Sequence, residues 1–169
     1  MNKLILLDGT QGVGKSTAAH CVCTISNGKY VCVDPDEYFN SNVVYFFFNG
    51  GYPVANNKII LKIVHKKVRE QIKDKNVVIP LTLNSHDYRE VWTKLFNDIA
   101  EVRHIILYAD KETLRNRINH DEGRDKELAL DNIDNNDKFY RGSIEGIIKI
   151  DTSALSPEAI AKRILESVH

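Results

Sequence analysis

The chain has 169 residues, with 23 basic and 23 acidic side chains, and its sequence pI is about 7.0. A chain of this length fits one domain, and we expect a single domain over residues 1–169. The balanced charge excludes a protein that binds nucleic acid through a general excess of Lys and Arg. Because no apolar run approaches the length of a membrane span, we also expect no membrane partner and a cytoplasmic protein, either a monomer or a homodimer.

Short apolar segments alternate along the chain with segments whose apolar residues recur at helical spacing. The pattern predicts strands over residues 4–7, 30–33, 77–81, 104–108 and 147–150. It predicts helices over residues 15–25 and 36–48, from Ile60 to Ile72, from Tyr88 to Ile99, after Asp110 and after Ser156. Five strands separated by helices predict an α/β fold, a three-layer sandwich around a five-stranded parallel sheet.

Polar residues mark where several of these helices begin. Asn84 and Asp110 are placed to cap the helices that follow them, and Ser156 precedes a proline at the first helical position. Residues 119–137 differ from the rest because they are rich in Asp, Asn and Glu and poor in large apolar side chains. We expect them to form a mobile lid.

The three cysteines, Cys21, Cys23 and Cys32, form neither a disulfide framework nor the four-ligand pattern of a zinc site. We therefore expect small, buried and reduced side chains.

Right-handed crossovers bring the carboxyl ends of all the parallel strands to one edge of the sheet. That edge receives Gly9, Asp34, Thr82 and Asp110. Because ligands of open α/β sheets bind at this edge, we expect the functional site there.

Residues 9–16, "GTQGVGKS", match the pattern G-x-x-x-x-G-K-[ST], with an apolar strand before them and a helix after them. Such a loop cradles phosphates with its backbone N–H groups, aided by the positive end of the helix. Lys15 would reach the β- and γ-phosphates, and Ser16 would bind Mg²⁺ through its hydroxyl. The loop predicts a nucleoside triphosphate site made by Gly9, Thr10, Gln11, Gly12, Val13, Gly14, Lys15, Ser16 and Thr17.

Three fates are open to the terminal phosphate of that nucleotide. A GTPase switch is disfavoured, because residues 152–154 read "TSA" but no N/T-K-x-D or D-x-x-G motif accompanies them. An energy-coupling ATPase is disfavoured because the third strand ends in Thr82 rather than in an acid. Transfer to a small molecule remains, and the acidic pair past the second strand favours it.

Asp34 and Asp36 would face the γ-phosphate across the cleft. Either carboxylate could take the proton of an acceptor hydroxyl or help to hold Mg²⁺, and the sequence leaves the division open. The acceptor would bind against about residues 36–57, which contain several aromatic side chains and no arginine. This composition suits an unphosphorylated molecule, although Arg89 could still reach an anion. Thr82 and His86 are further candidates for the acceptor side.

Arginines gather after the fourth strand, at Arg115, Arg117, Arg124 and Arg141. On a closing segment they would neutralise charge on the transferred phosphoryl group while water is excluded. Arg115 and Arg117 cannot share one side of a helix, so at most one of them points inward. We favour Arg117 and Arg124 as catalytic arginines.

The sequence resembles the P-loop small-molecule kinases, which include shikimate and gluconate kinases, chloramphenicol phosphotransferase and relatives of adenylate kinase. In particular it is similar to the tunicamycin-resistance-protein group, through the phosphate loop and the stretches "YVCVDPDEYF", "VVIPLTLNSHDY" and "HIILYADKETLRNRI". The likeness covers roughly residues 1–150, but residues 40–57 have no clear counterpart. It implies ATP as donor, a five-stranded parallel sheet, a mobile lid, and an adenine site near Arg117, Thr152 and Ser153.

These observations predict an ATP- and Mg²⁺-dependent phosphotransferase acting on a hydroxyl of a small antibiotic-, nucleoside- or sugar-like molecule. The alternative is an ATP-binding protein that sequesters such a ligand without transferring phosphate.

Overall fold

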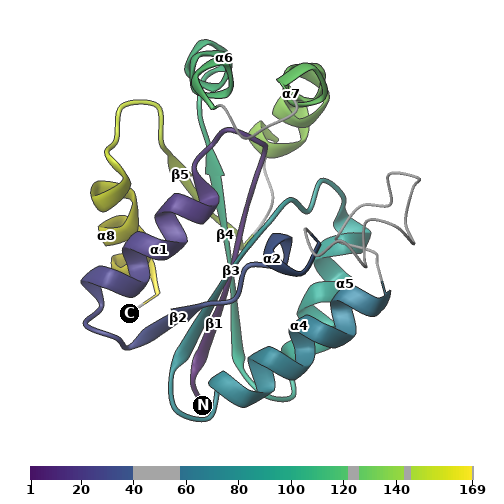
Figure 1. Ribbon diagram of the computed structural model, residues 1–169, viewed down its shortest axis with the longest axis vertical. Coiled ribbons are helices and arrows are strands. Elements are labelled where there is room, and N and C mark those ends of the chain that lie inside the picture. Colours follow the sequence, from purple (N-terminus) through teal and green to yellow (C-terminus); the bar gives the residue numbers. More distant parts are fainter. Residues whose placement is uncertain (40–57, 122–125, 143–145, 169) are drawn as a thin grey trace.

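The computed structural model describes residues 1–39, 58–121, 126–142 and 146–168, and its elements are shown in Figure 1. The strands are β1 (Lys3–Gly9), β2 (Tyr30–Cys32), β3 (Asn76–Leu81), β4 (Glu101–Tyr108) and β5 (Ile148–Asp151). The helices are α1 (Lys15–Ile25), α2 (Asp36–Phe39), α4 (Lys58–Gln71), α5 (His86–Phe96), α6 (Lys111–His120), α7 (Lys126–Arg141) and α8 (Pro157–Ser167).

The five strands form one parallel sheet in the order β2-β3-β1-β4-β5. The central strand β1 pairs with β3 on one side and with β4 on the other, with Asp8 opposite Leu81 and Gly9 opposite Leu107. The residues that follow β1 therefore leave the sheet at its middle. The expected α/β sandwich with a five-stranded parallel sheet is confirmed.

Alternate residues of β1 supply the cores of the two outer layers. Ile5 and Leu7 pack with α1 and α8, whereas Leu4 and Leu6 pack with α4 and α5. All four side chains are fully buried, and burying one such side chain stabilises the fold by about 1.5–3 kcal/mol. In Figure 1 the helices α1 and α8 cover one face, α4 and α5 cover the other, and α6 and α7 lie beyond the carboxyl ends of the strands.

Two details of α5 differ from the sequence prediction. The residue that caps the helix is Ser85, whose hydroxyl accepts from the Tyr88 N–H, so the assignment of Asn84 was wrong. Val91 is one of the apolar residues at helical spacing between Tyr88 and Ile99, yet it is 40% exposed, and Arg89 is buried instead. The apolar face is thus interrupted by a cation, which the periodicity of apolar residues does not detect.

The expected caps Asp110 and Ser156 are confirmed. The Asp110 carboxylate accepts from the Thr113 N–H at 2.7 Å, which lowers the pKa of Asp110 to about 2. Ser156 accepts from the Ala159 N–H at 3.2 Å, and Pro157 opens α8.

Residues 126–137, which are most of the segment expected to form a lid, belong to the regular helix α7 and pack against the core. Ala129 and Ile133 are buried in the core on the α1 side of the sheet, and Tyr140 is buried near the end of the helix. Few apolar side chains are enough here because they fall on one face. Whether this region moves as a lid stays a prediction.

The three cysteines are free and half-buried. Burial is the main cause that raises the pKa of the Cys32 thiol to about 12, so this thiol stays protonated at neutral pH. Among the described residues, no helix is long and apolar enough to cross a membrane.

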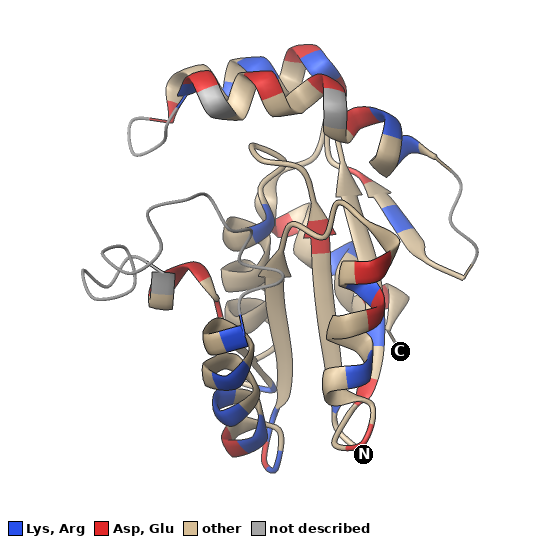
Figure 2. Cartoon of the chain, turned by 90° about the vertical axis from the view of Figure 1, so that its right-hand side faces the viewer, with Lys and Arg blue, Asp and Glu red and all other residues tan. Residues whose placement is uncertain are grey.

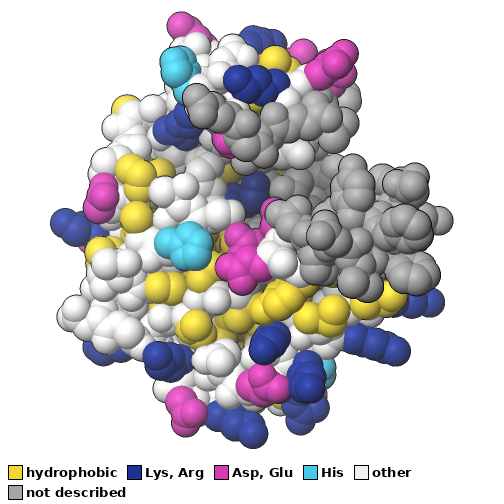
Figure 3. Space-filling model, viewed as in Figure 1, with side chains coloured by type: hydrophobic (Ala, Val, Ile, Leu, Met, Phe, Trp, Pro, Cys, Tyr) yellow, Lys and Arg dark blue, Asp and Glu magenta, His cyan; other side chains and the backbone are white. Residues whose placement is uncertain are grey.

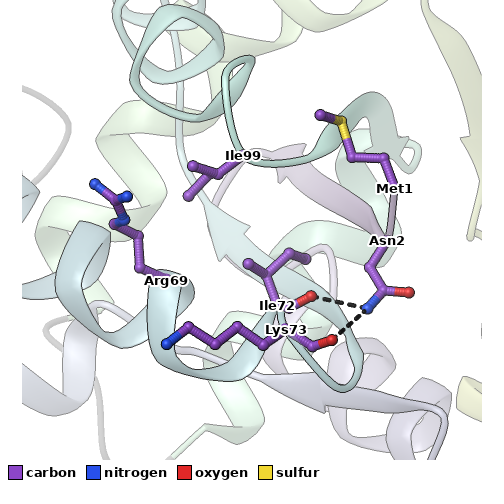
Figure 4. A pocket seen from close by; sticks show the side chains of 6 residues that line it. All are labelled: Met1, Asn2, Arg69, Ile72, Lys73 and Ile99. Carbon is purple, nitrogen blue, oxygen red and sulfur yellow. Dashed lines mark hydrogen bonds between the residues drawn. The ribbon is translucent and has the colours of Figure 1, made fainter.

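The outer face of α4 is basic, although the whole chain is neutral. Its exposed side chains are mostly Lys and Arg, and these gather around α4 in Figures 2 and 3. A cavity of about 490 Å³ lies near the end of α4 and the start of β1, lined by Met1, Asn2, Arg69, Ile72, Lys73 and Ile99 (Figure 4). Asn2 closes one side of it by donating to the Ile72 carbonyl at 2.8 Å. These residues lie at the amino end of β1, away from the glycine loop.

Candidate phosphate-binding site

The loop between β1 and α1 has no room for a Cβ atom at two positions. Gly12 has φ +77°, and a Cβ there would lie 2.8 Å from Ile118 Cγ1. Gly9 has φ +154°, and a Cβ there would lie 2.4 Å from the Leu107 carbonyl oxygen. The loop therefore packs directly against β4 and α6, and this close approach requires glycine at positions 9 and 12.

The start of α1 is suited to an anion. Gly14, its N-cap residue, gives no side-chain hydrogen bond, and the first turn contains no acidic residue. The first N–H groups of the helix thus lack the side-chain partner that a capping residue gives, and the helix dipole is positive at this end. Lys15 adds a cation, and its Nζ donates to the carbonyls of Gly9 at 2.8 Å and Thr10 at 2.9 Å. These residues fit a polyphosphate.

The other motif residues divide by burial. Thr10 and Val13 are buried, whereas Ser16 and Thr17 are exposed at the start of α1, where hydroxyls can meet a ligand. Gln11 is half-buried, and its Oε1 has no hydrogen-bond partner within the described ranges.

Arg117 lies inward from α6 and contacts the loop from the α1 side of the sheet. Its guanidinium donates to the Thr152 carbonyl at 2.8 Å, to Thr152 Oγ1 at 3.1 Å and to the Val13 carbonyl at 3.3 Å. Ser153 lies beside this group and accepts from the Asp110 N–H at 2.9 Å. The structure thus brings together the three residues expected near the adenine.

The remaining arginines of the cluster are placed differently. Arg115 is exposed and lies 3.9 Å from Asp134, so only Arg117 of that pair points inward. Arg141 donates to the Ala109 carbonyl and is ion-paired with Asp137. Arg124 lies outside the described residues, so its expected catalytic position stays a prediction.

Asp34 lies two residues after the end of β2 and is 7% exposed. Its Oδ1 accepts from the Asp36 N–H at 3.0 Å, which begins α2 in the way an Asx turn does. Asp36 itself is exposed. Most of the expected acceptor segment, residues 40–57, lies outside the described ranges.

Thr82 and His86 follow β3. The Thr82 hydroxyl donates to the Gly9 carbonyl at 3.2 Å. Thr82 therefore lies at the phosphate loop, whereas from the sequence it was a candidate for the acceptor side. The His86 ring makes an edge contact with Phe139, with centroids 5.6 Å apart, so it packs against α7.

A buried polar group below the loop was not predicted. Asp8 is fully buried at the end of β1 and forms an ion pair with Arg89, whose Nε lies 2.9 Å from Asp8 Oδ2. The anion that Arg89 reaches is therefore inside the protein. A signal was available, because Asp8 continues the alternation of Leu4 and Leu6 toward the core, and a buried carboxylate requires a cation or several donors.

Comparison with known proteins supports this description. A protein-family model described as "AAA domain" (AAA_33) matches residues 4–136. No curated protein matches the chain in sequence.

Solved structures similar to this chain include a sugar kinase from Janibacter sp. HTCC2649, with 16% identity, TM-score 0.71, and 99% and 95% of the two chains covered. The tunicamycin resistance protein of Deinococcus radiodurans has the same identity and TM-score, with 99% and 96% covered. The APS kinase CysC of Mycobacterium tuberculosis, solved with AMPPNP and APS, has 15% identity, TM-score 0.67, and 99% and 97% covered. At these identities the likeness shows the fold, which is that of the P-loop small-molecule kinases.

Proposed function

The chain belongs to the AAA domain family, and from that premise we propose that it is an ATP- and Mg²⁺-dependent phosphotransferase. Its acceptor would be a hydroxyl group of a small antibiotic-, nucleoside- or sugar-like molecule. The observation that carries this proposal is the pairing of a phosphate loop at the middle of the sheet with a carboxylate, Asp34, at the end of the edge strand β2.

The donor half of the site is assigned to the loop. The N–H groups at the start of α1 and the Lys15 ammonium would bind the phosphates, and Ser16 would contribute a ligand to Mg²⁺. The metal would neutralise charge on the β- and γ-phosphates. Arg117, held against Thr152 and Val13, would border the adenine, and with Arg124 would stabilise charge on the phosphoryl group in transfer.

The acceptor half is assigned to the residues after β2. Asp34 or Asp36 would accept the proton of the attacking hydroxyl, and Asp34 is a candidate outer ligand of Mg²⁺. The Asp34 carboxylate is held by its bond to the Asp36 N–H, so its orientation is fixed before the acceptor binds. Breaking the bond between the γ-phosphorus and the β–γ bridging oxygen of ATP gives ADP, and the new bond joins that phosphorus to the acceptor oxygen.

The similar structures favour this choice over a switch or a motor. Two of them are kinases of small molecules, and the APS kinase was solved with AMPPNP, an analogue of ATP. The residues between Asp34 and Val68 contain no arginine for a phosphate group of the acceptor.

One observation favours a second function, an ATP-binding protein that sequesters its ligand. The residue after β3 is Thr82 rather than an acid, and its hydroxyl is bonded to the Gly9 carbonyl. The similar fold of a tunicamycin resistance protein supports an antibiotic as the ligand of such a protein.

The experiment that tests the proposal is an ADP-release screen against nucleosides, sugars and antibiotics, followed by mass measurement of the acceptor. We expect one acceptor to stimulate ADP release and to gain about 80 Da, the mass of one phosphoryl group carried in a kinase reaction. Ligand-stimulated ATP binding without ADP would support sequestration instead.

A further inference from the structure

The Asp8 carboxylate joins four separate segments of the chain. Its Oδ1 accepts from the N–H groups of Gly9 at 2.7 Å and Leu83 at 2.8 Å, and from the Tyr140 hydroxyl at 2.8 Å. Its Oδ2 accepts from Arg89 Nε at 2.9 Å. Gly9 is the first residue of the phosphate loop, so this carboxylate fixes the point at which the loop leaves the sheet.

Tyr140 is the contribution of α7 to this group. Its side chain is almost fully buried, and burial together with the nearby Asp8 carboxylate raises the pKa of the Tyr140 hydroxyl above its usual range. The hydroxyl therefore remains a donor at every physiological pH. A hydrogen bond to a charged and buried acceptor is strong, because a buried carboxylate that loses its donor cannot form a hydrogen bond with solvent instead.

Arg89 is held by α7 as well as by Asp8. Its side chain is 6% exposed, and its guanidinium carbon lies 4.4 Å from the centroid of the Phe139 ring and 5.8 Å from that of Tyr140. Nη1 and Nη2 have no hydrogen-bond partner in the part of the chain that the structure describes. The two aromatic rings therefore provide the electrostatic contact for that side of the cation.

A second link from α7 reaches the next residue of the loop. Asn136 is one helical turn before Tyr140, so both side chains project from the same face. Asn136 is 6% exposed, and its Nδ2 donates to Thr10 Oγ1 at 3.3 Å. Gly9 and Thr10, whose carbonyls also receive the Lys15 ammonium, are thus tied to α7 through two side chains.

We propose that Tyr140 and Asn136 are positioning residues for the phosphate loop. By docking on Asp8 and Thr10 they hold the start of the loop in the conformation that receives the nucleotide phosphates. The inference rests on the proposed nucleotide site. It adds to the determinants of nucleotide affinity two residues that lie outside the loop motif, some 130 positions further along the chain.

Tyr140→Phe is the most direct test, because it removes one hydroxyl and keeps the aromatic ring over Arg89. We expect the Kd for Mg-ATP, measured by titration calorimetry well below the melting temperature, to rise about tenfold. Hydrogen exchange of the amides of residues 9–16 should become faster in the unliganded protein. Tyr30→Phe is the matched control, because Tyr30 is buried in β2 away from this group.

Asn136→Ala tests the second link, with Asn116→Ala on the exposed face of α6 as its control. We expect a smaller rise in Kd than for Tyr140→Phe, because the bond to Thr10 joins two neutral groups at 3.3 Å.

The two readouts separate this proposal from the proposed function. If Tyr140→Phe lowers the melting temperature but leaves both the Kd and the exchange of residues 9–16 unchanged, Tyr140 serves fold stability alone and the proposal is overturned. If the wild-type protein does not bind ATP, the proposed function fails, and the exchange measurement still decides whether Tyr140 orders the loop.

Discussion

The two sides of the phosphate loop are supported by different chemistry. On the α1 side, the Arg117 guanidinium and the Thr152 hydroxyl both donate to the Val13 carbonyl of the loop, which is a neutral acceptor. On the α5 side, the start of the loop is supported by a buried ion pair between Asp8 and Arg89. The first side consists of residues that a motif or a family resemblance identifies, and the second consists of residues that no motif marks. The difference teaches that a phosphate-loop motif specifies the contacts with the ligand but not the supports of the loop.

The loop itself gives the largest expected effect. Lys15→Ala removes the cation that would bind the β- and γ-phosphates, and we expect at least about a hundredfold loss of ATP affinity in a calorimetric titration. Lys66→Ala on the exposed face of α4 is the control and should bind as the wild type does. If Lys15→Ala bound ATP with near-normal affinity, the assignment of this loop as the nucleotide site would be wrong, whichever side of the loop is considered.

The acceptor side is tested by Asp34→Asn. The amide keeps an oxygen that can accept from the Asp36 N–H, so the turn should form and ATP affinity should stay near that of the wild type. We expect turnover with the acceptor to fall at least about a hundredfold, because an amide cannot take the proton. Unchanged turnover in this variant would transfer the role of base to Asp36.

Arg117→Lys probes the α1 side of the comparison. A lysine cannot make the contacts with Thr152 and Val13 at once, because these come from the planar guanidinium. We expect roughly a tenfold loss of ATP affinity, with Arg115→Lys on the exposed side of α6 as control. Equal effects of the two substitutions would show that the inward position of Arg117 has no part in binding.

His104 gives the smallest effect and reports on the α5 side. Its Nε2 lies 2.8 Å from Thr93 Oγ1, and its Nδ1 has no hydrogen-bond partner within the described ranges. Burial lowers the pKa of His104, and Arg89 lowers it further, while Asp8 opposes this. The folded protein thus favours neutral His104.

Because the pKa of His104 is lower in the folded state, the unfolded chain takes up this proton first as the pH falls. The stability it contributes is present above pH 6.5, its ordinary pKa, and is lost as the pH falls toward the folded pKa. We expect the free energy of unfolding to decrease by at most about 1.4 kcal/mol per pH unit in that window. Denaturant titrations from pH 7.5 to 5.5 would check this. In His104→Gln the free energy of unfolding should depend less steeply on pH than in the wild type. The same pH dependence in both proteins would contradict the expectation.

The sequence was a good guide where local chemistry decides the structure. The strands, the phosphate loop and the caps Asp110 and Ser156 follow from apolar runs, glycine spacing and short-range hydrogen bonds. It was a poorer guide where a partner lies far away in the chain. Arg89 was read as free to bind an anion, because its partner Asp8 is 81 positions away. Residues 119–137 were expected to form a lid because they contain few large apolar side chains. One face of α7, with Ala129 and Ile133, nevertheless packs into the core.

The central claim, transfer of phosphate to a small molecule, is tested most directly by following the label of [γ-³²P]ATP in the presence of the acceptor found by the screen. The account predicts that the wild-type protein moves the label into the acceptor with one ADP formed for each labelled molecule, and that Lys15→Ala does not. Label recovered only in ATP, or only in inorganic phosphate, at saturating ATP and acceptor would contradict it.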